Sequence, residues 1–229
     1  MTKELICMAN SHMRGRRCVA GIQIRYGYAN WIRPISERAD HALSASQRQY
    51  PGGVEPQVLD VISVPLDSSR PMGFQWENWR IAPSARWQKV GRVGWDKLRE
   101  LEQRPSTLWG QSYGDSSVGG VNNRVPVRRR HILRDSLKLI RVDHLKLDVE
   151  LDRDGKKRLW GKFNHNGLTY RLHVKDAMYE SKCLAQNVRN HVLGDCFLTV
   201  SLTLGFKEYA YKLVAAIVER TKFESASRP

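Results

Sequence analysis

Three carboxylates, Asp60, Asp67 and Glu77, are the residues of this chain whose type could support metal chemistry. Carboxylate oxygens bind Mg²⁺, and a bound Mg²⁺ can promote phosphodiester cleavage. Predicted strands and turns separate the three residues, so their spacing alone does not assemble a site. The sequence contains no P-loop, H-E-x-x-H or G-x-S-x-G pattern. We therefore expect a protein without catalytic activity, cofactor or metal ion, and keep a metal-dependent nuclease as an alternative.

Positive charge is the strongest bulk property of the chain. Its 229 residues include 38 Lys and Arg against 23 Asp and Glu, which gives a net charge of +15 and a pI near 10.0. Such a balance is typical of proteins that bind nucleic acid. Attraction to anionic lipid is the alternative, but no basic amphipathic helix stands out. The composition therefore favours a nucleic-acid partner.

Cations stand beside aromatic residues at several points, a mixture that can hold phosphates and stack bases. Arg128, Arg129 and Arg130 form the densest run, although a charge run can also be only a solvated face. Trp160 and Lys162 are two residues apart on a predicted strand and so share a face, although a strand Trp is often a core residue. The candidate nucleic-acid-binding residues are Arg14, Arg16, Arg17, Arg33, Arg80, Arg128, Arg129, Arg130, Trp160, Lys162, Tyr170 and Arg171.

Short strands separated by turns account for most of the remaining sequence. Residues 136–142 and 144–151 alternate strictly between apolar and polar, as half-buried strands do, and residues 75–81 alternate aromatic and polar side chains. Residues 95–102 have helical spacing, and residues 209–218 favour a strand over a helix. We predict a mainly β fold of two small barrels with few short helices: residues 1–110 with a helical tail, a basic linker at 111–135, and residues 136–229.

The cellular setting follows from cysteine usage and from the lack of apolar runs. The four cysteines lack the short spacing of a zinc site, so we expect buried thiols. No run approaches the roughly 18 apolar residues of a membrane span. The first residues are not a secretory signal. We expect a cytoplasmic protein that has no contact with membranes.

The order of several short blocks resembles that of the bacterial dual OB-containing domain family. None of the blocks is a catalytic signature, and together they extend over almost the whole chain. The blocks are Ile6-Cys-Met-Ala-Asn-Ser11, Arg17-Cys-Val-Ala-Gly21, Trp31-Ile-Arg-Pro-Ile-Ser36, Leu59-Asp-Val with Glu77-Asn78, Thr199-Val-Ser-Leu202 and Tyr211-Lys-Leu-Val-Ala-Ala-Ile217.

The resemblance implies two OB-like barrels in tandem, a nucleic-acid-binding role and a place beside bacterial anti-phage defence genes. OB barrels offer stacking platforms beside cations, which favours single-stranded DNA or RNA as the ligand. The alternative is a protein-interaction adaptor that docks a partner ATPase or nuclease, with the strand at residues 211–218 as an adhesive edge if it is exposed.

Overall fold

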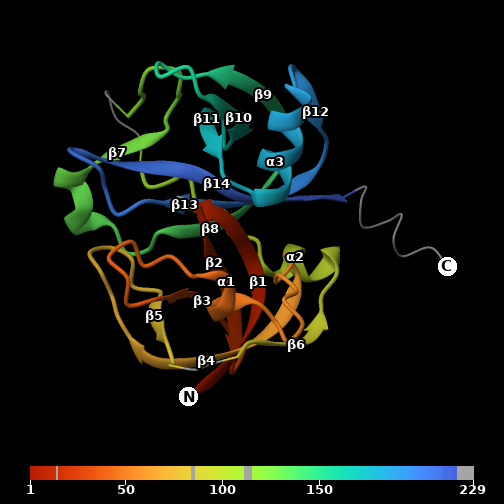
Figure 1. Ribbon diagram of the computed structural model, residues 1–229. Helices are drawn as coiled ribbons and strands as arrows, with labels where there is room; N and C mark the ends of the chain where they lie inside the picture. The colour runs from red at the N-terminus through yellow and green to blue at the C-terminus, as the bar shows by residue number, and fades with distance from the viewer. Residues whose placement is uncertain (14, 84–85, 111–114, 221–229) are drawn as a thin grey trace.

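The computed structural model describes residues 1–13, 15–83, 86–110 and 115–220, which fold into two β-barrels (Figure 1). The first barrel occupies the lower part of that view and the second barrel the upper part. The expectation of a mainly β fold with few short helices is confirmed. None of the described helices has the length and apolar character needed to cross a membrane.

Five strands of the first barrel pair in a ring, β1-β2-β3-β5-β4 and back to β1. The β3–β5 pairing is parallel and the others are antiparallel, while β6 adds to β4. Buried and partly exposed residues alternate along β4, and the buried ones, including Ile62, Val64 and Leu66, point into the core that the ring encloses. The elements are β1 (Thr2–Met13), β2 (Arg16–Arg25), β3 (Tyr28–Ile35), α1 (Ala45–Arg48), β4 (Asp60–Ser69), β5 (Asn78–Ile81), β6 (Gln88–Arg92) and α2 (Trp95–Leu101).

The second barrel repeats this pairing order. Strands β8 and β9 together take the place of β1, and the sheet runs β9-β10-β11-β14-β13-β8, with β11 and β14 parallel. Helix α3 joins β11 to β12 and is capped by Asp176, whose side chain accepts from two backbone N–H groups. The elements are β7 (Arg124–Pro126), the 3₁₀ helix η1 (Val127–Ile132), β8 (Leu137–Val142), β9 (Leu145–Leu151), β10 (Lys157–His165), β11 (Leu168–Val174), α3 (Ala177–Gln186), β12 (His191–Leu193), β13 (Cys196–Leu202) and β14 (Tyr209–Glu219).

Strand β14 lies inside the second sheet. It pairs with β11 on one side and β13 on the other, and β7 pairs with its first residues. This corrects the idea that residues 211–218 form an exposed adhesive edge. In the segment expected to be a linker, residues 124–126 form β7 and residues 127–132 form η1, whereas residues 111–114 lie outside the described residues.

The two barrels pack face to face, with β8, β13 and β14 lying over β1, β2 and β3 (Figure 1). Ile22 and Met8 from the first barrel meet Leu139 and Phe197 from the second in one apolar cluster. Small residues pack beside it, Ala20 among them, and let the strands approach closely. The outer face of β2 and β3 around Ala20, Ile22 and Trp31 is therefore covered by the second barrel, whereas residues 24–30 are exposed.

A buried ion pair fastens this interface. Arg33 is 4% exposed, and its Nη1 lies 3.1 Å from Oε1 of Glu77. Nη2 donates to Oγ of Ser136 at 2.9 Å and to Oγ of Ser201 at 3.3 Å, both in the second barrel. Its burial corrects the expectation that Arg33 contacts nucleic acid. The guanidinium instead ties the two barrels together.

We expect Arg33→Met to lower the free energy of unfolding by about 3–5 kcal/mol, because Glu77 is left buried without its cation. Urea titration followed by tryptophan fluorescence measures this loss, with the exposed Arg38→Met as the control. A loss below about 1 kcal/mol would show that the pair contributes little to the interface.

Candidate nucleic-acid interface

Three segments that are distant in sequence meet on one side of the molecule. Residues 70–77 connect β4 to β5, residues 203–208 make the equivalent connection between β13 and β14, and residues 127–134 contain η1. We call these segments together the loop surface. At the left of Figure 1, the green coil of η1 lies beside the blue turn between β13 and β14.

Hydrogen bonds and close packing fix the three segments to one another. Nε2 of Gln75 donates to the carbonyl oxygen of Leu202 at 3.2 Å, and the N–H of Val127 donates to the carbonyl of Glu208 at 2.8 Å. A Cβ atom on Gly73 would lie 3.8 Å from Cδ2 of Leu204. The equivalent connections of both barrels thus form one continuous surface.

Exposed aromatic rings lie beside exposed cations on the loop surface. Trp76 is 55% exposed, and the guanidinium carbon of Arg134 lies 5.8 Å from its ring centroid. Phe206 is 62% exposed, with Nζ of Lys207 at 5.6 Å from its ring centroid. Arg128 is also exposed. Rings that stack bases beside cations that contact phosphates are the components of a single-strand-binding site.

Tight turns carry the two rings. The indole N–H of Trp76 donates to the carbonyl oxygen of Gly73 at 3.1 Å, and Gly73 has a φ of +57°, which suits glycine. Phe206 is held by backbone hydrogen bonds with Tyr209 in both directions, at 2.8 and 3.3 Å. The hydrogen bond therefore orients the Trp76 ring, which lowers the entropy cost of stacking, whereas the turn fixes only the backbone of Phe206.

The basic run at residues 128–130 divides its cations between two roles. Arg128 faces solvent, whereas Nη2 of Arg129 binds Oδ1 of the buried Asp115 at 2.5 Å. The side chain of Arg130 lies outside the described residues. Arg129 thus anchors η1 through Asp115, and of the two side chains that the structure describes Arg128 is the exposed one.

A buried lysine lies behind this anchor. Lys212 is 1% exposed, and burial lowers its pKa to about 8, although the nearby Asp115 acts in the opposite direction. Its Nζ lies 5.4 Å from the ring centroid of Tyr170. Tyr170 is itself fully buried, and its hydroxyl accepts from the N–H of Leu108. Its burial corrects the expectation that Tyr170 contacts nucleic acid.

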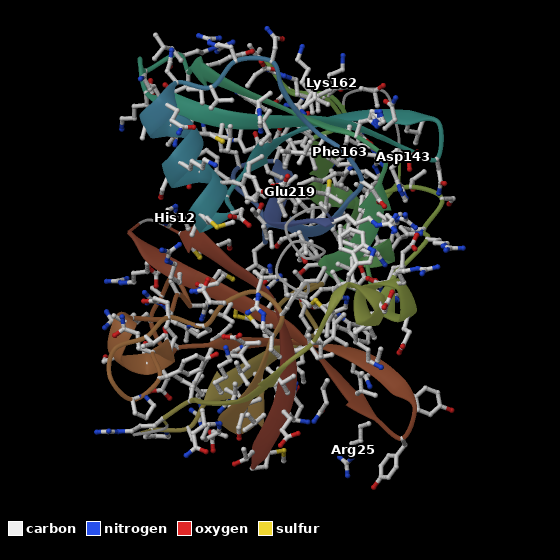
Figure 2. The ribbon with its side chains drawn as sticks, turned by 90° about the vertical axis from the view of Figure 1, so that its right-hand side faces the viewer. His12, Arg25, Asp143, Lys162, Phe163 and Glu219 are labelled. Atoms are coloured by element: carbon white, nitrogen blue, oxygen red, sulfur yellow. The ribbon has the colours of Figure 1, made fainter. Side chains whose placement is uncertain are left out.

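The expected pair Trp160 and Lys162 lies on the outer face of the second barrel. Lys162 is exposed there, and Figure 2 shows it at the surface while Phe163 points inward. Trp160 is only 9% exposed. The ring centroid of His173 lies 3.8 Å from that of Trp160, and the guanidinium carbon of Arg171 lies 4.5 Å from the Trp160 ring centroid. The two residues share a face as expected, but Trp160 is not open to a base in this structure.

The remaining expected cations of the first barrel are held in local ion pairs. Arg16 pairs with Asp40 at 2.7 Å, and Arg80 pairs with Asp67 and with Glu37. Arg17 is partly buried, and Arg14 lies outside the described residues. Arg16 and Arg80 are thus engaged by carboxylates of the first barrel.

The three carboxylates considered for metal binding lie in separate ion pairs. Asp60 is buried, with Nζ of Lys89 at 2.8 Å and Nη1 of Arg92 at 2.9 Å. Asp67 pairs with Arg80, and Glu77 pairs with Arg33. In the part of the chain that the structure describes, no group of three or more His, Cys, Asp or Glu residues could hold a metal ion.

Stability should rise with pH across the range in which Lys212 titrates. Its pKa is about 8 in the folded protein and 10.5 when unfolded, so the unfolded state binds more protons between these values. The folded state therefore gains up to about 3 kcal/mol from pH 8 to pH 10.5. We expect Lys212→Met to remove this rise in urea titrations, while the exposed Lys156→Met keeps it. If the free energy of unfolding rises equally with pH in both variants, Lys212 is not the group responsible for the rise.

The comparisons with known proteins concern the fold. No curated protein matches the chain. A murine DNA-binding protein bound to double-stranded DNA aligns over 96% of this chain and 99% of its own, with 6% identity and a TM-score of 0.35. The tetrameric p202 HIN2 aligns over 96% of this chain and 92% of its own, with 8% identity and a TM-score of 0.33. The Ifi202 HINa domain in complex with a 20-base-pair DNA aligns over 95% of both chains, with 10% identity and a TM-score of 0.34. Similarity at this level does not carry a function across.

The family profile of the dual OB-containing domain matches residues 3–217. This range includes all strands of the first barrel and nearly all of the second. The match agrees with the shared pairing order of the two barrels, in which the third and fifth strands of each are parallel. The chain therefore belongs to the dual OB-containing domain family.

Proposed function

We propose that this protein binds nucleic acid, preferably single-stranded DNA or RNA, through the loop surface. The observation that carries the proposal is the convergence of the equivalent connections of both barrels around η1, with two exposed aromatic rings beside exposed cations. OB barrels bind oligonucleotides through this connection, among other parts. The net charge of +15 favours the same partner.

Removing the cations of the loop surface should lower both the affinity and its salt dependence. Each phosphate contact contributes about 0.7 to the slope of log K against log salt, so Arg128→Ala/Arg134→Ala/Lys207→Ala should reduce the slope by about 2. Fluorescence anisotropy with labelled oligo-dT and oligo-U over a salt series measures it. The control is Arg86→Ala/Arg99→Ala/Arg104→Ala, which removes the same charge near β6 and α2. Equal slopes for the two variants would contradict the site.

The aromatic rings should contribute affinity that is independent of salt. Stacking of one base is worth about 1–3 kcal/mol, so Trp76→Ala and Phe206→Ala should each weaken oligonucleotide binding by about 5- to 150-fold. The matched control is Tyr26→Ala, because Tyr26 is 85% exposed but lies on the β2–β3 turn. If Trp76→Ala and Phe206→Ala behave like this control, the rings do not stack bases.

We also propose that the protein holds a strand and does not cut it. The carboxylates that could bind a metal ion are each neutralised by a cation of the protein. We expect labelled oligonucleotides to stay intact on incubation with the protein and Mg²⁺ or Mn²⁺. Metal-dependent cleavage that Asp60→Ala abolishes would instead establish a nuclease.

An adaptor role is the second candidate, and the β2–β3 turn favours it. Arg25 projects from the first barrel (Figure 2), and the nearby Tyr26 and Tyr28 are 85% and 74% exposed. Tyrosine and arginine are enriched at protein interfaces. We propose that the protein acts in the bacterial cytoplasm as an accessory subunit of an anti-phage defence system, beside a partner ATPase or nuclease. Genes for such enzymes next to this one would support the proposal.

A further inference from the structure

A second face of the protein has the composition of a nucleic-acid site, but the protein's own chain covers it. Strands β10 and β11 occupy the positions of the second and third strands of an OB barrel, whose outer face binds oligonucleotides in other OB proteins. Trp160, Lys162, Arg171 and His173 point outward there. Residues 116–121, which we call the strap, lie across this face.

The strap is attached mainly through its backbone. The N–H of Val121 donates to the carbonyl oxygen of Arg171 at 3.2 Å, and the N–H of Arg171 donates to the carbonyl oxygen of Val121 at 2.9 Å. The guanidinium of Arg171 donates to the carbonyl oxygen of Gly119. The adjoining Asn122 adds one side-chain bond, from Nδ2 to the carbonyl of Thr169 at 2.9 Å. The strap therefore pairs with β11 much as an added strand would.

Little apolar surface holds the strap in place. Val118 is 76% exposed and Val121 is 37% exposed, so neither is fully buried in the barrel. The residue above Trp160 is Gly119, and a Cβ atom there would lie 3.5 Å from Cζ2 of the indole. Because hydrophobic stabilisation scales with buried apolar area, the strap gains little from it. What the strap shields is a large aromatic ring.

The face beneath carries an excess of positive charge. In the strand register, Lys162 lies opposite Lys146 on one side and Arg171 on the other. Like charges directly opposite each other are destabilising. The charge of Arg171 is balanced by an ion pair with Glu150, and that of Lys146 by Asp148, whose Oδ2 lies 4.0 Å from Nζ of Lys146. Lys162 has no ion-pair partner among the described residues. A phosphate group would relieve the repulsion along this row.

We propose that the strap is an internal competitor: single-stranded nucleic acid displaces it, stacks a base on Trp160 and places phosphates against Lys162 and Arg171. This inference rests on the proposed function, because it supplies a second contact for the same ligand. The strap belongs to the same segment as η1, with Asn122, Asn123 and β7 between them. One continuous stretch of chain therefore borders both the covered face and the loop surface.

Displacement has a measurable consequence. The apparent affinity of a site that is open only part of the time is reduced by the open fraction. Loosening the strap should therefore tighten binding without adding any contact. Asn122→Ala does this, because it removes the bond to Thr169 and places alanine at a φ of +49°.

The experiment compares three proteins with labelled oligo-dT and oligo-U of about 20 nucleotides, long enough for both barrels. They are the unmodified chain, Asn122→Ala and the control Asn190→Ala, which changes an exposed asparagine of similar φ (+50°) outside the strap. We expect Asn122→Ala to bind about fivefold more tightly and Asn190→Ala to be unchanged. Adding Lys162→Ala or Trp160→Ala to Asn122→Ala should cancel the gain. Hydrogen exchange at the amides of Val121 and Arg171 should speed up when the oligonucleotide binds.

The outcomes separate this inference from the proposed function. If the unmodified chain binds through the loop surface, but Asn122→Ala is neutral and both amides stay protected, the strap proposal is overturned and the proposed function stands. If only Asn122→Ala binds, and Lys162→Ala cancels that binding, the strap proposal holds and the loop surface is not the site. If no protein binds at low salt, both are overturned.

Discussion

The packing of one barrel's outer face against the other is the constraint on which the rest of the structure depends. Arg33 and Glu77 lie at its centre, and the guanidinium reaches hydroxyl groups of the second barrel. Two apolar clusters also join the barrels. An interface of this kind fixes the two barrels as one unit, because separating them would expose both the apolar surface and an ion pair.

This packing decides where a ligand can bind. Part of the outer face of β2 and β3 is used for the interface, and the strap lies against Trp160 on the equivalent face of β10 and β11. The connections between the fourth and fifth strands are exposed, and the fixed orientation of the barrels brings them together beside η1. Neither barrel alone contains the full set of rings and cations. The loop surface is therefore a product of the tandem arrangement.

Much of the fold follows from the sequence. Strict alternation in residues 136–151 gives β8 and β9, and helical spacing gives α2 at residues 95–101. The family resemblance supplied the tandem barrels.

The site was harder to predict, because burial depends on pairing over long sequence distances. Arg33 and Tyr170 look like surface candidates locally, but both are buried by segments more than 40 residues away. Trp76 was expected on a strand, yet β5 begins at Asn78, so Trp76 lies in an exposed turn. Phe206 and Lys207 were missed; Gly205 before them was the available sign of a turn.

The central claim is that nucleic acid contacts the loop surface formed by both barrels. Photocrosslinking with oligonucleotides that carry 4-thiouracil or 4-thiothymine, followed by mass spectrometry of the crosslinked peptides, tests it most directly. The account predicts crosslinks to the peptides that contain Trp76 and Phe206, from residues 70–77 and 203–208, in the same complex. Crosslinks confined to the β2–β3 turn at Tyr26 and Tyr28, with none to either loop, would contradict it.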